Sequence, residues 1–170
     1  MQKQVEYEKA GKTKYPEPIV FVIAKDANGK ANPMTAGWAT NVSSSPPMKA
    51  VALVPKRYTA AAIRHSKCFT IVYPAADMES EALFFGTKSG SDIDKLEVTG
   101  CKTEPATKID SVILSDATAN FECELETEIP IGDHILFVGK VVASHMNTEP
   151  TKRLYTTAAG GKMGPAGPAS

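Results

Sequence analysis

The stretch that decides the fold is Ile19-Val20-Phe21-Val22-Ile23-Ala24, an apolar run rich in β-branched residues. It follows Pro18 and stops at the turn-forming residues Asp26-Ala27-Asn28-Gly29-Lys30. A short apolar run between turn signals is typical of a buried strand. The ordered part of the chain is therefore predicted to open with a strand and a turn.

Short runs bounded by proline continue after this turn. Met34 to Ser43 alternates small, polar and apolar residues up to Pro46-Pro47, and Ala50 to Val54 is another apolar run before Pro55. Phe69 to Tyr73 has the same strand-like composition. Because proline within sheets is confined to edges and strand ends, these boundaries predict separate short strands.

Two segments have the composition of short helices. Thr59 to Lys67 begins with a residue that can cap a helix and continues with good helix formers. Met78 to Phe85 places apolar residues at a helix-like spacing that ends near Gly86.

Two longer strands are expected in the second half of the chain. Residues 120–129 alternate polar and apolar side chains, which predicts a half-exposed strand, and residues 134–145 predict a mostly buried one. Strands at such close intervals leave little room for the helical crossovers of a doubly wound sheet. The predicted fold is mainly β: a β-barrel or strongly twisted antiparallel sheet with short peripheral helices.

The length of the chain, 170 residues, suits one domain better than two. We expect a single domain over residues 1–157. Residues 158–170 are rich in Gly, Pro and Ala, a composition that packs poorly, so a mobile C-terminal tail is predicted there.

Composition argues against several classes of partner. Nineteen basic residues balance nineteen acidic ones without clustering, which disfavours nucleic acid, and no apolar run is long enough for a membrane span. Met1 to Glu6 is charged where a signal peptide is apolar, so a cytoplasmic protein is expected. Cys68, Cys101 and Cys123 lack the spacing of a metal site and are predicted to be reduced thiols.

Three loop clusters carry residues that suit a ligand. In Asn32 to Thr40, small residues beside Trp38 either let a planar ligand approach the backbone or form an edge strand with a buried Trp38. In Pro55 to Thr59, Arg57 and Thr59 stand at the start of a helix, where the amides favour a phosphate, although an ordinary cap has the same composition.

The third cluster, Thr87 to Lys95, mixes hydroxyl groups, Gly90 and two lysines. If this loop folds over the second cluster, Ser89 and Lys95 supply a hydroxyl and a point charge to the same phosphate. Taken alone, it is also an ordinary polar loop. The chain has neither a Gly-x-Gly-x-x-Gly nor a P-loop motif, so a bound nucleotide would need another device.

Over residues 17–146 the chain resembles the flavin reductase-like, FMN-binding split-barrel proteins, which include flavoredoxins. Five motifs in family order carry the resemblance: Asn32-Pro33-Met34-Thr35-Ala36-Gly37-Trp38; Val42-Ser43 with Pro46-Pro47; Arg57-Tyr58-Thr59; Gly86-Thr87-Lys88-Ser89-Gly90 with Asp94-Lys95; and Gly132-Asp133-His134 continuing to Val141.

The resemblance implies a Greek-key split barrel, a homodimer, and FMN bound near the dimer interface. It assigns the isoalloxazine and ribityl chain to Met34, Thr35, Ala36, Gly37, Trp38, Ala39 and Thr40. It assigns the phosphate to Arg57, Thr59, Ser89 and Lys95, with Tyr58 and Gly90 in the same motifs. No catalytic side chain or metal ligand is expected, because hydride and electron transfer are chemistry of the flavin itself.

The implied function is an NAD(P)H-dependent, flavin reductase-like oxidoreductase that passes reducing equivalents through FMN to free flavin or another acceptor. The alternative is a flavoredoxin-like electron carrier reduced by a redox protein partner. A third class is a flavin-free binding module. His134 is either structural or placed near the nicotinamide or the interface. The segment after Thr148 is shorter than in many relatives, so the substrate is not predicted.

Overall fold

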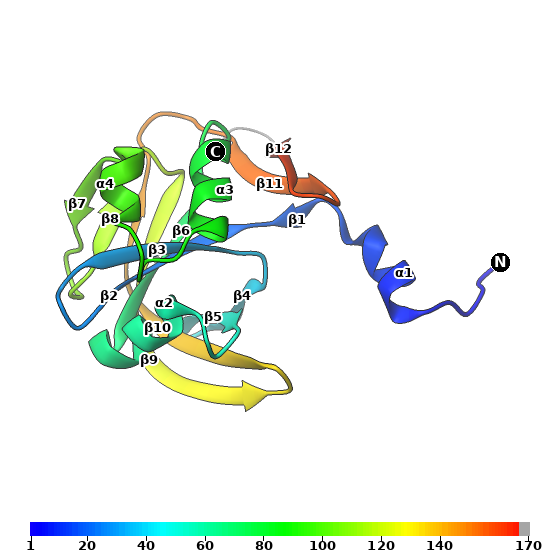
Figure 1. Cartoon of the computed structure of the whole chain (residues 1–170), viewed down its shortest axis with the longest axis horizontal. Coiled ribbons are helices and arrows are strands. Elements are labelled where there is room, and N and C mark those ends of the chain that lie inside the picture. The colour runs from blue at the N-terminus through cyan, green and yellow to red at the C-terminus, as the bar shows by residue number, and fades with distance from the viewer. Residues whose placement is uncertain (167–170) are drawn as a thin grey trace.

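A seven-stranded antiparallel sheet forms the body of the protein, as the computed structural model of residues 1–166 shows (Figure 1). The strand order is β3-β2-β6-β9-β10-β5-β4. In chain order the strands are β2 (Val20–Lys25), β3 (Ala31–Ala36), β4 (Ala39–Ser44), β5 (Pro47–Leu53), β6 (Cys68–Tyr73), β9 (Ala119–Ile131) and β10 (His134–Met146).

The two edge strands of this sheet, β3 and β4, are neighbours in sequence but lie at opposite ends of the strand order. The chain crosses from one edge to the other at Gly37 and Trp38, and the Ala52 amide donates a hydrogen bond to the Trp38 carbonyl at 2.9 Å. The sheet is therefore curled into a barrel that stays open between β3 and β4. This confirms the predicted mainly-β, Greek-key split barrel.

Strand β2 shows why its sequence is apolar throughout. Val20, Val22 and Ala24 pack into the core inside the barrel, whereas Phe21 and Ile23 pack into a second core on the other face. In that second core the rings of Phe21 and Phe85 meet edge to face, with centroids 5.1 Å apart. A strand buried on both faces offers few positions for a polar side chain, because each one would need buried hydrogen-bond partners.

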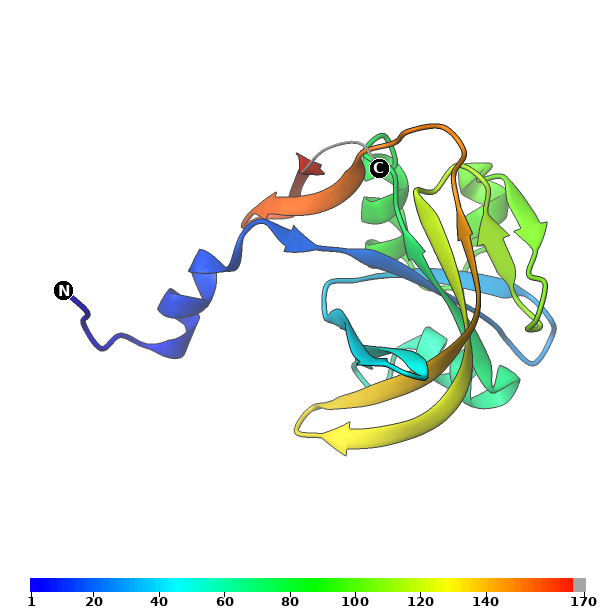
Figure 2. The ribbon, with the colours of Figure 1, turned by 180° about the vertical axis from the view of Figure 1, so that it is seen from behind.

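Smaller elements surround the barrel. Residues 1–166 contain five helical segments: α1 (Tyr7–Gly11), the 3-10 helix η1 (Lys12–Lys14), α2 (Tyr58–Ser66), α3 (Glu79–Thr87) and α4 (Lys95–Thr99). Two small sheets pair β7 (Thr103–Pro105) with β8 (Val112–Leu114), and β1 (Glu17–Pro18) with β11 (Arg153–Ala158) and β12 (Lys162–Ala166). Figures 1 and 2 both show α1 standing away from the barrel, and it contains no buried residue.

The two long strands differ from their predicted exposure. Asn120 and Glu122 of β9 are 4% and 0% exposed, because the segment that carries β7 and β8 covers this part of the sheet. In β10 only alternate residues near the start are buried, and the second half is partly exposed. The prediction of a half-exposed β9 therefore holds for Glu124 and Glu126 but not for Asn120 and Glu122, and the prediction of a mostly buried β10 was wrong.

The region predicted as a tail contains a paired strand. β12 pairs with β11 in antiparallel register, and Met163 packs against the second core. Residues 167–170 lie outside the described part, so the mobility of the end stays a prediction. Among the helices of residues 1–166, none is long and apolar enough to span a membrane.

Candidate functional site

The three loop clusters meet at one pocket of about 220 Å³. Strand β3, the start of α2 and the loop between α3 and α4 each supply part of its wall. The lining residues are Asn32, Met34, Lys56, Arg57, Tyr58, Thr59, Thr87, Lys88, Ser89, Gly90 and Lys95. The third cluster thus lies beside the second, as a phosphate site shared by Ser89 and Lys95 with Arg57 requires.

The pocket, which we call the cationic pocket, concentrates one sign of charge. Four of its lining residues are cations, namely Lys56, Arg57, Lys88 and Lys95, and none is an Asp or Glu. Within residues 1–166 none of these four cations forms an ion pair. The pocket therefore suits an anion, and none of the described residues supplies one.

Lys95 is the most deeply placed of the four cations, with 3% of its surface exposed. It is the first residue of α4, whose N-cap Asp94 accepts hydrogen bonds from the Leu96 and Glu97 amides. The Lys95 ammonium donates to the carbonyls of Pro33 at 2.8 Å and Phe85 at 3.0 Å. An ammonium has three donors, so one is left for a ligand.

The pKa of Lys95 is shifted because its buried ammonium has no anionic partner among the described residues. Burial, followed by the positive charge of Arg57, lowers the pKa of Lys95 to about 8. The two cations, which both line the cationic pocket, thus raise each other's energy. An anion placed there would relieve both the repulsion and the lost hydration.

Helix α2 contributes its N-terminus to the cationic pocket. The N-cap is Arg57 and no side chain accepts a hydrogen bond from the first-turn amides, so the partial positive charge of this end stays available. Thr59 lies inside the helix, which means that the prediction of Thr59 as the cap was wrong. Its hydroxyl accepts a hydrogen bond from Asn32 Nδ2 at 2.8 Å, and its own proton remains free to donate.

The back of the cationic pocket is closely packed. A Cβ atom on Gly90 would lie 1.9 Å from Asn32 Oδ1, so only glycine lets the loop approach this side chain. Asn32 Oδ1 is buried and has no hydrogen-bond partner in the described chain. Tyr58 forms a fixed wall, because its hydroxyl donates to Asp26 Oδ2 at 2.6 Å. This hydrogen bond and burial raise the pKa of Tyr58.

A second hollow of about 240 Å³ adjoins the cationic pocket and shares Met34 and Arg57 with it. We call it the aromatic hollow. Its other lining residues are Lys14, Glu17, Thr35, Ala36, Gly37, Trp38, Ala52, Leu53, Val54 and His134. The predicted residues from Met34 to Trp38 therefore lie together beside the predicted anion site.

Trp38 and His134 form one side of the aromatic hollow. Their ring centroids are 4.7 Å apart with the planes tilted by 37°. Trp38 is 54% exposed, so the alternative of an edge strand with a buried tryptophan was wrong. Asp133 Oδ1 lies 2.6 Å from His134 Nδ1, and this contact lowers the pKa of Asp133.

Two predicted site residues fall elsewhere. Ala39 and Thr40 line a third hollow, together with Lys49, Tyr73 and Arg153, and not the two hollows described above. Sequence reasoning missed Lys14 and Glu17 of the aromatic hollow. They precede the first recognisable strand, and no local pattern marks them as neighbours of Trp38.

The family of the chain follows from its match to a family model described as "Flavin reductase like domain", which covers residues 12–162. The chain belongs to this family.

Solved structures of similar fold carry related descriptions. A flavoredoxin from Methanosarcina acetivorans is 21% identical, with a TM-score of 0.86 and coverage of 100% of this chain and 94% of that one. An FMN-binding protein from Thermus thermophilus is 23% identical, with a TM-score of 0.85 and coverage of 100% and 98%. An NADH:FAD oxidoreductase from Streptomyces globisporus is 18% identical, with a TM-score of 0.81 and coverage of 99% of both chains.

Proposed function

We propose that this protein binds FMN with its phosphate in the cationic pocket and its ring system in the aromatic hollow. The proposal rests on one observation: a pocket with four cations that lack ion-pair partners among the described residues adjoins a hollow that contains the exposed Trp38. Met34 and Arg57 belong to both, so one elongated ligand with an anionic end and a planar end suits them. The names of the FMN-binding protein and the flavoredoxin support this ligand.

The residues divide into two groups by the part of FMN that they would hold. Arg57, Lys95 and the hydroxyls of Thr59 and Ser89 would hold the phosphate, together with the N-terminus of α2. Residues from Met34 to Trp38 would line the ring system, where small side chains leave backbone groups within reach. Bound FMN supplies the transfer of hydride or single electrons.

The proposed reaction is the transfer of reducing equivalents from NAD(P)H to free flavin or another acceptor. The family description and the neighbouring NADH:FAD oxidoreductase support it. His134 lines the aromatic hollow in contact with the exposed Trp38, where it can orient a second ring against the flavin. The alternative is an electron carrier reduced by a redox protein partner, which the likeness to a flavoredoxin supports.

The visible spectrum of the purified protein tests both proposals. A flavin spectrum is expected after purification or after addition of FMN, and a colourless protein that takes up no FMN contradicts flavin binding. Anaerobic mixing with NADH or NADPH then separates the two activities. Rapid bleaching of the flavin identifies a reductase, whereas absent bleaching identifies a carrier.

A homodimer is proposed on three features of the described chain. Residues 7–14 have no buried side chain, β4 is an edge strand with Val42 exposed, and the tip of the β9–β10 hairpin exposes Ile129 and Ile131. Unpaired edges and exposed apolar residues favour a partner that covers them. Light scattering at micromolar concentration should give twice the chain mass, and a monomer mass contradicts the proposal.

A further inference from the structure

The third hollow, about 170 Å³ in volume, contains two cations that neither the cationic pocket nor the aromatic hollow uses. It lies where β4, β5, β6 and β11 approach one another, and Lys49, Tyr73 and Arg153 form its polar wall. Lys49 and Tyr73 also line a larger neighbouring hollow of about 790 Å³ with apolar side chains from Val42, Met48, Phe121 and Val141. The two hollows together thus offer a charged end and an apolar body.

Lys49 is buried, with 6% of its surface exposed. Its ammonium donates to Asn41 Oδ1 at 2.8 Å and to the Tyr73 hydroxyl at 2.7 Å, and it lies 3.9 Å from the centroid of the Phe121 ring. All of these partners are uncharged. Two of its three donors are used, so one remains for a ligand.

Arg153 approaches the same tyrosine from β11. Its guanidinium carbon lies 3.6 Å from the centroid of the Tyr73 ring, and one terminal nitrogen donates to the Ile19 carbonyl at 3.1 Å. The Nε atom is buried without a hydrogen-bond partner in residues 1–166. An unpaired buried donor costs free energy that a suitable acceptor would recover.

Among the residues that the structure describes, no Asp or Glu lines either of these hollows. Elsewhere the chain supplies counter-charges to its cations, as Glu17 does for Lys14 at 2.6 Å and Glu128 for Arg64 at 2.8 Å. Lys49 and Arg153 have no such ion pair in the described residues, although removal of a cation from water without an anion is costly. A planar carboxylate matches both the charge and the free donors of an ammonium and a guanidinium.

We propose that the third hollow binds the carboxylate of a small organic acid between Lys49 and Arg153, with the apolar part of that acid in the larger hollow. The proposal concerns binding alone and does not depend on FMN. Ala39 and Thr40, which directly follow Trp38 in the chain, line this site, so an acid bound here lies next to the strand that continues from the aromatic hollow.

Calorimetric titration with benzoate and with its uncharged analogue benzamide tests the proposal. Benzoate is expected to bind at least tenfold more tightly than benzamide. Lys49→Met and, separately, Arg153→Gln should each weaken benzoate binding at least tenfold and leave benzamide binding unchanged. Lys140→Met is the matched control, because Lys140 is an exposed lysine on the neighbouring strand, and it should leave benzoate affinity unchanged.

Several outcomes overturn the proposal. Equal affinity for benzoate and benzamide, or no heat with benzoate at millimolar concentration, excludes a carboxylate site. A loss of benzoate binding in Arg57→Ala but not in Lys49→Met places the anion in the cationic pocket. If Lys49→Met instead changes the oligomeric mass while benzoate does not bind, the cations serve a contact with a second copy. Thermal melting of each variant tests whether it is folded. If Lys49→Met is unfolded, the benzoate affinity of Arg153→Gln decides between these outcomes.

Discussion

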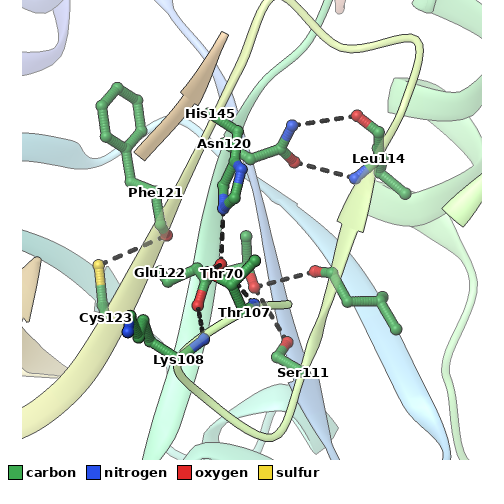
Figure 3. A network of polar contacts seen from close by, with 11 residues as sticks. Thr70, Thr107, Lys108, Ser111, Leu114, Asn120, Phe121, Glu122, Cys123 and His145 are labelled. Carbon is green, nitrogen blue, oxygen red and sulfur yellow. Dashed lines mark hydrogen bonds and ion pairs between the residues drawn. The ribbon is translucent and has the colours of Figure 1, made fainter. Parts of the chain in front are cut away.

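Glu122 and Lys95 are both charged and both buried, but the chain treats them differently. Glu122, which is 0% exposed, accepts four hydrogen bonds: from the Thr107 amide at 2.8 Å, the Thr107 hydroxyl at 2.9 Å, the Lys108 amide at 2.7 Å and His145 Nε2 at 2.6 Å (Figure 3). Lys95 has two neutral carbonyl acceptors and faces a second cation, Arg57.

The pKa values of the two groups move in ways that reflect this difference. Burial raises the pKa of Glu122, but hydrogen bonds from Thr107, His145 and Lys108 outweigh it and lower the pKa to about 2, so the charged form is favoured. Burial and Arg57 disfavour the charged form of Lys95. The buried charge that the chain satisfies holds a loop in place, whereas the one that it leaves incomplete lies where we propose that a ligand binds.

Removal of the Glu122 charge should have the largest effect on stability. Glu122→Gln removes the charge and replaces one carboxylate oxygen by an NH2 group, so at least one buried donor, such as the Lys108 amide, loses its acceptor. This should lower the free energy of unfolding by roughly 1–3 kcal/mol. Urea unfolding measures this loss. Glu124→Gln, an exposed position on the same strand, should change it by less than about 0.5 kcal/mol. Equal losses of unfolding free energy at the two positions would show that the buried hydrogen bonds to Glu122 do not stabilise the fold more than an exposed carboxylate does.

The hydrogen bonds to Glu122 should also make the stability of the wild-type protein depend on pH in the acidic range. Because the folded pKa of Glu122 is depressed to about 2 from an ordinary 4.5, its contribution to stability is present above pH 4.5. That contribution is lost as the pH falls from 4.5 toward 2. Unfolding free energies measured across this window should drop more steeply for the wild type than for Glu122→Gln. Parallel curves for the two proteins would contradict the assignment.

The pH dependence of flavin binding tests the role of Lys95, the second buried charge. In the protein without FMN, burial and Arg57 lower the pKa of Lys95 to about 8, and a bound phosphate should keep its side chain protonated. FMN affinity should therefore fall as the pH rises above about 8, by at most about tenfold per pH unit. Lys95→Met should bind FMN more weakly at neutral pH and lose this dependence between pH 7 and 9.5. Riboflavin affinity, measured beside it, should be flat in both proteins.

Much of the fold and part of the site were predictable from the sequence. The apolar run of β2 and the proline-bounded strands have local signals, and Arg57, Ser89 and Lys95 were assigned to one anion site because of their charge and hydroxyl chemistry. The burial of Glu122 was not predictable, since its cover comes from a loop that no local pattern places there. Ala39 and Thr40 continue a predicted motif, but the turn into β4 carries them to another hollow.

The affinity ratio of FMN to riboflavin tests the central claim most directly, because the two ligands differ only by the phosphate. Fluorescence titration of the apoprotein should show FMN bound more tightly than riboflavin. Arg57→Ala should lower the FMN affinity roughly ten- to a hundredfold, corresponding to about 1.5–3 kcal/mol for a charge-assisted hydrogen bond, with riboflavin affinity nearly unchanged. An unchanged ratio in Arg57→Ala would contradict a phosphate site at the cationic pocket.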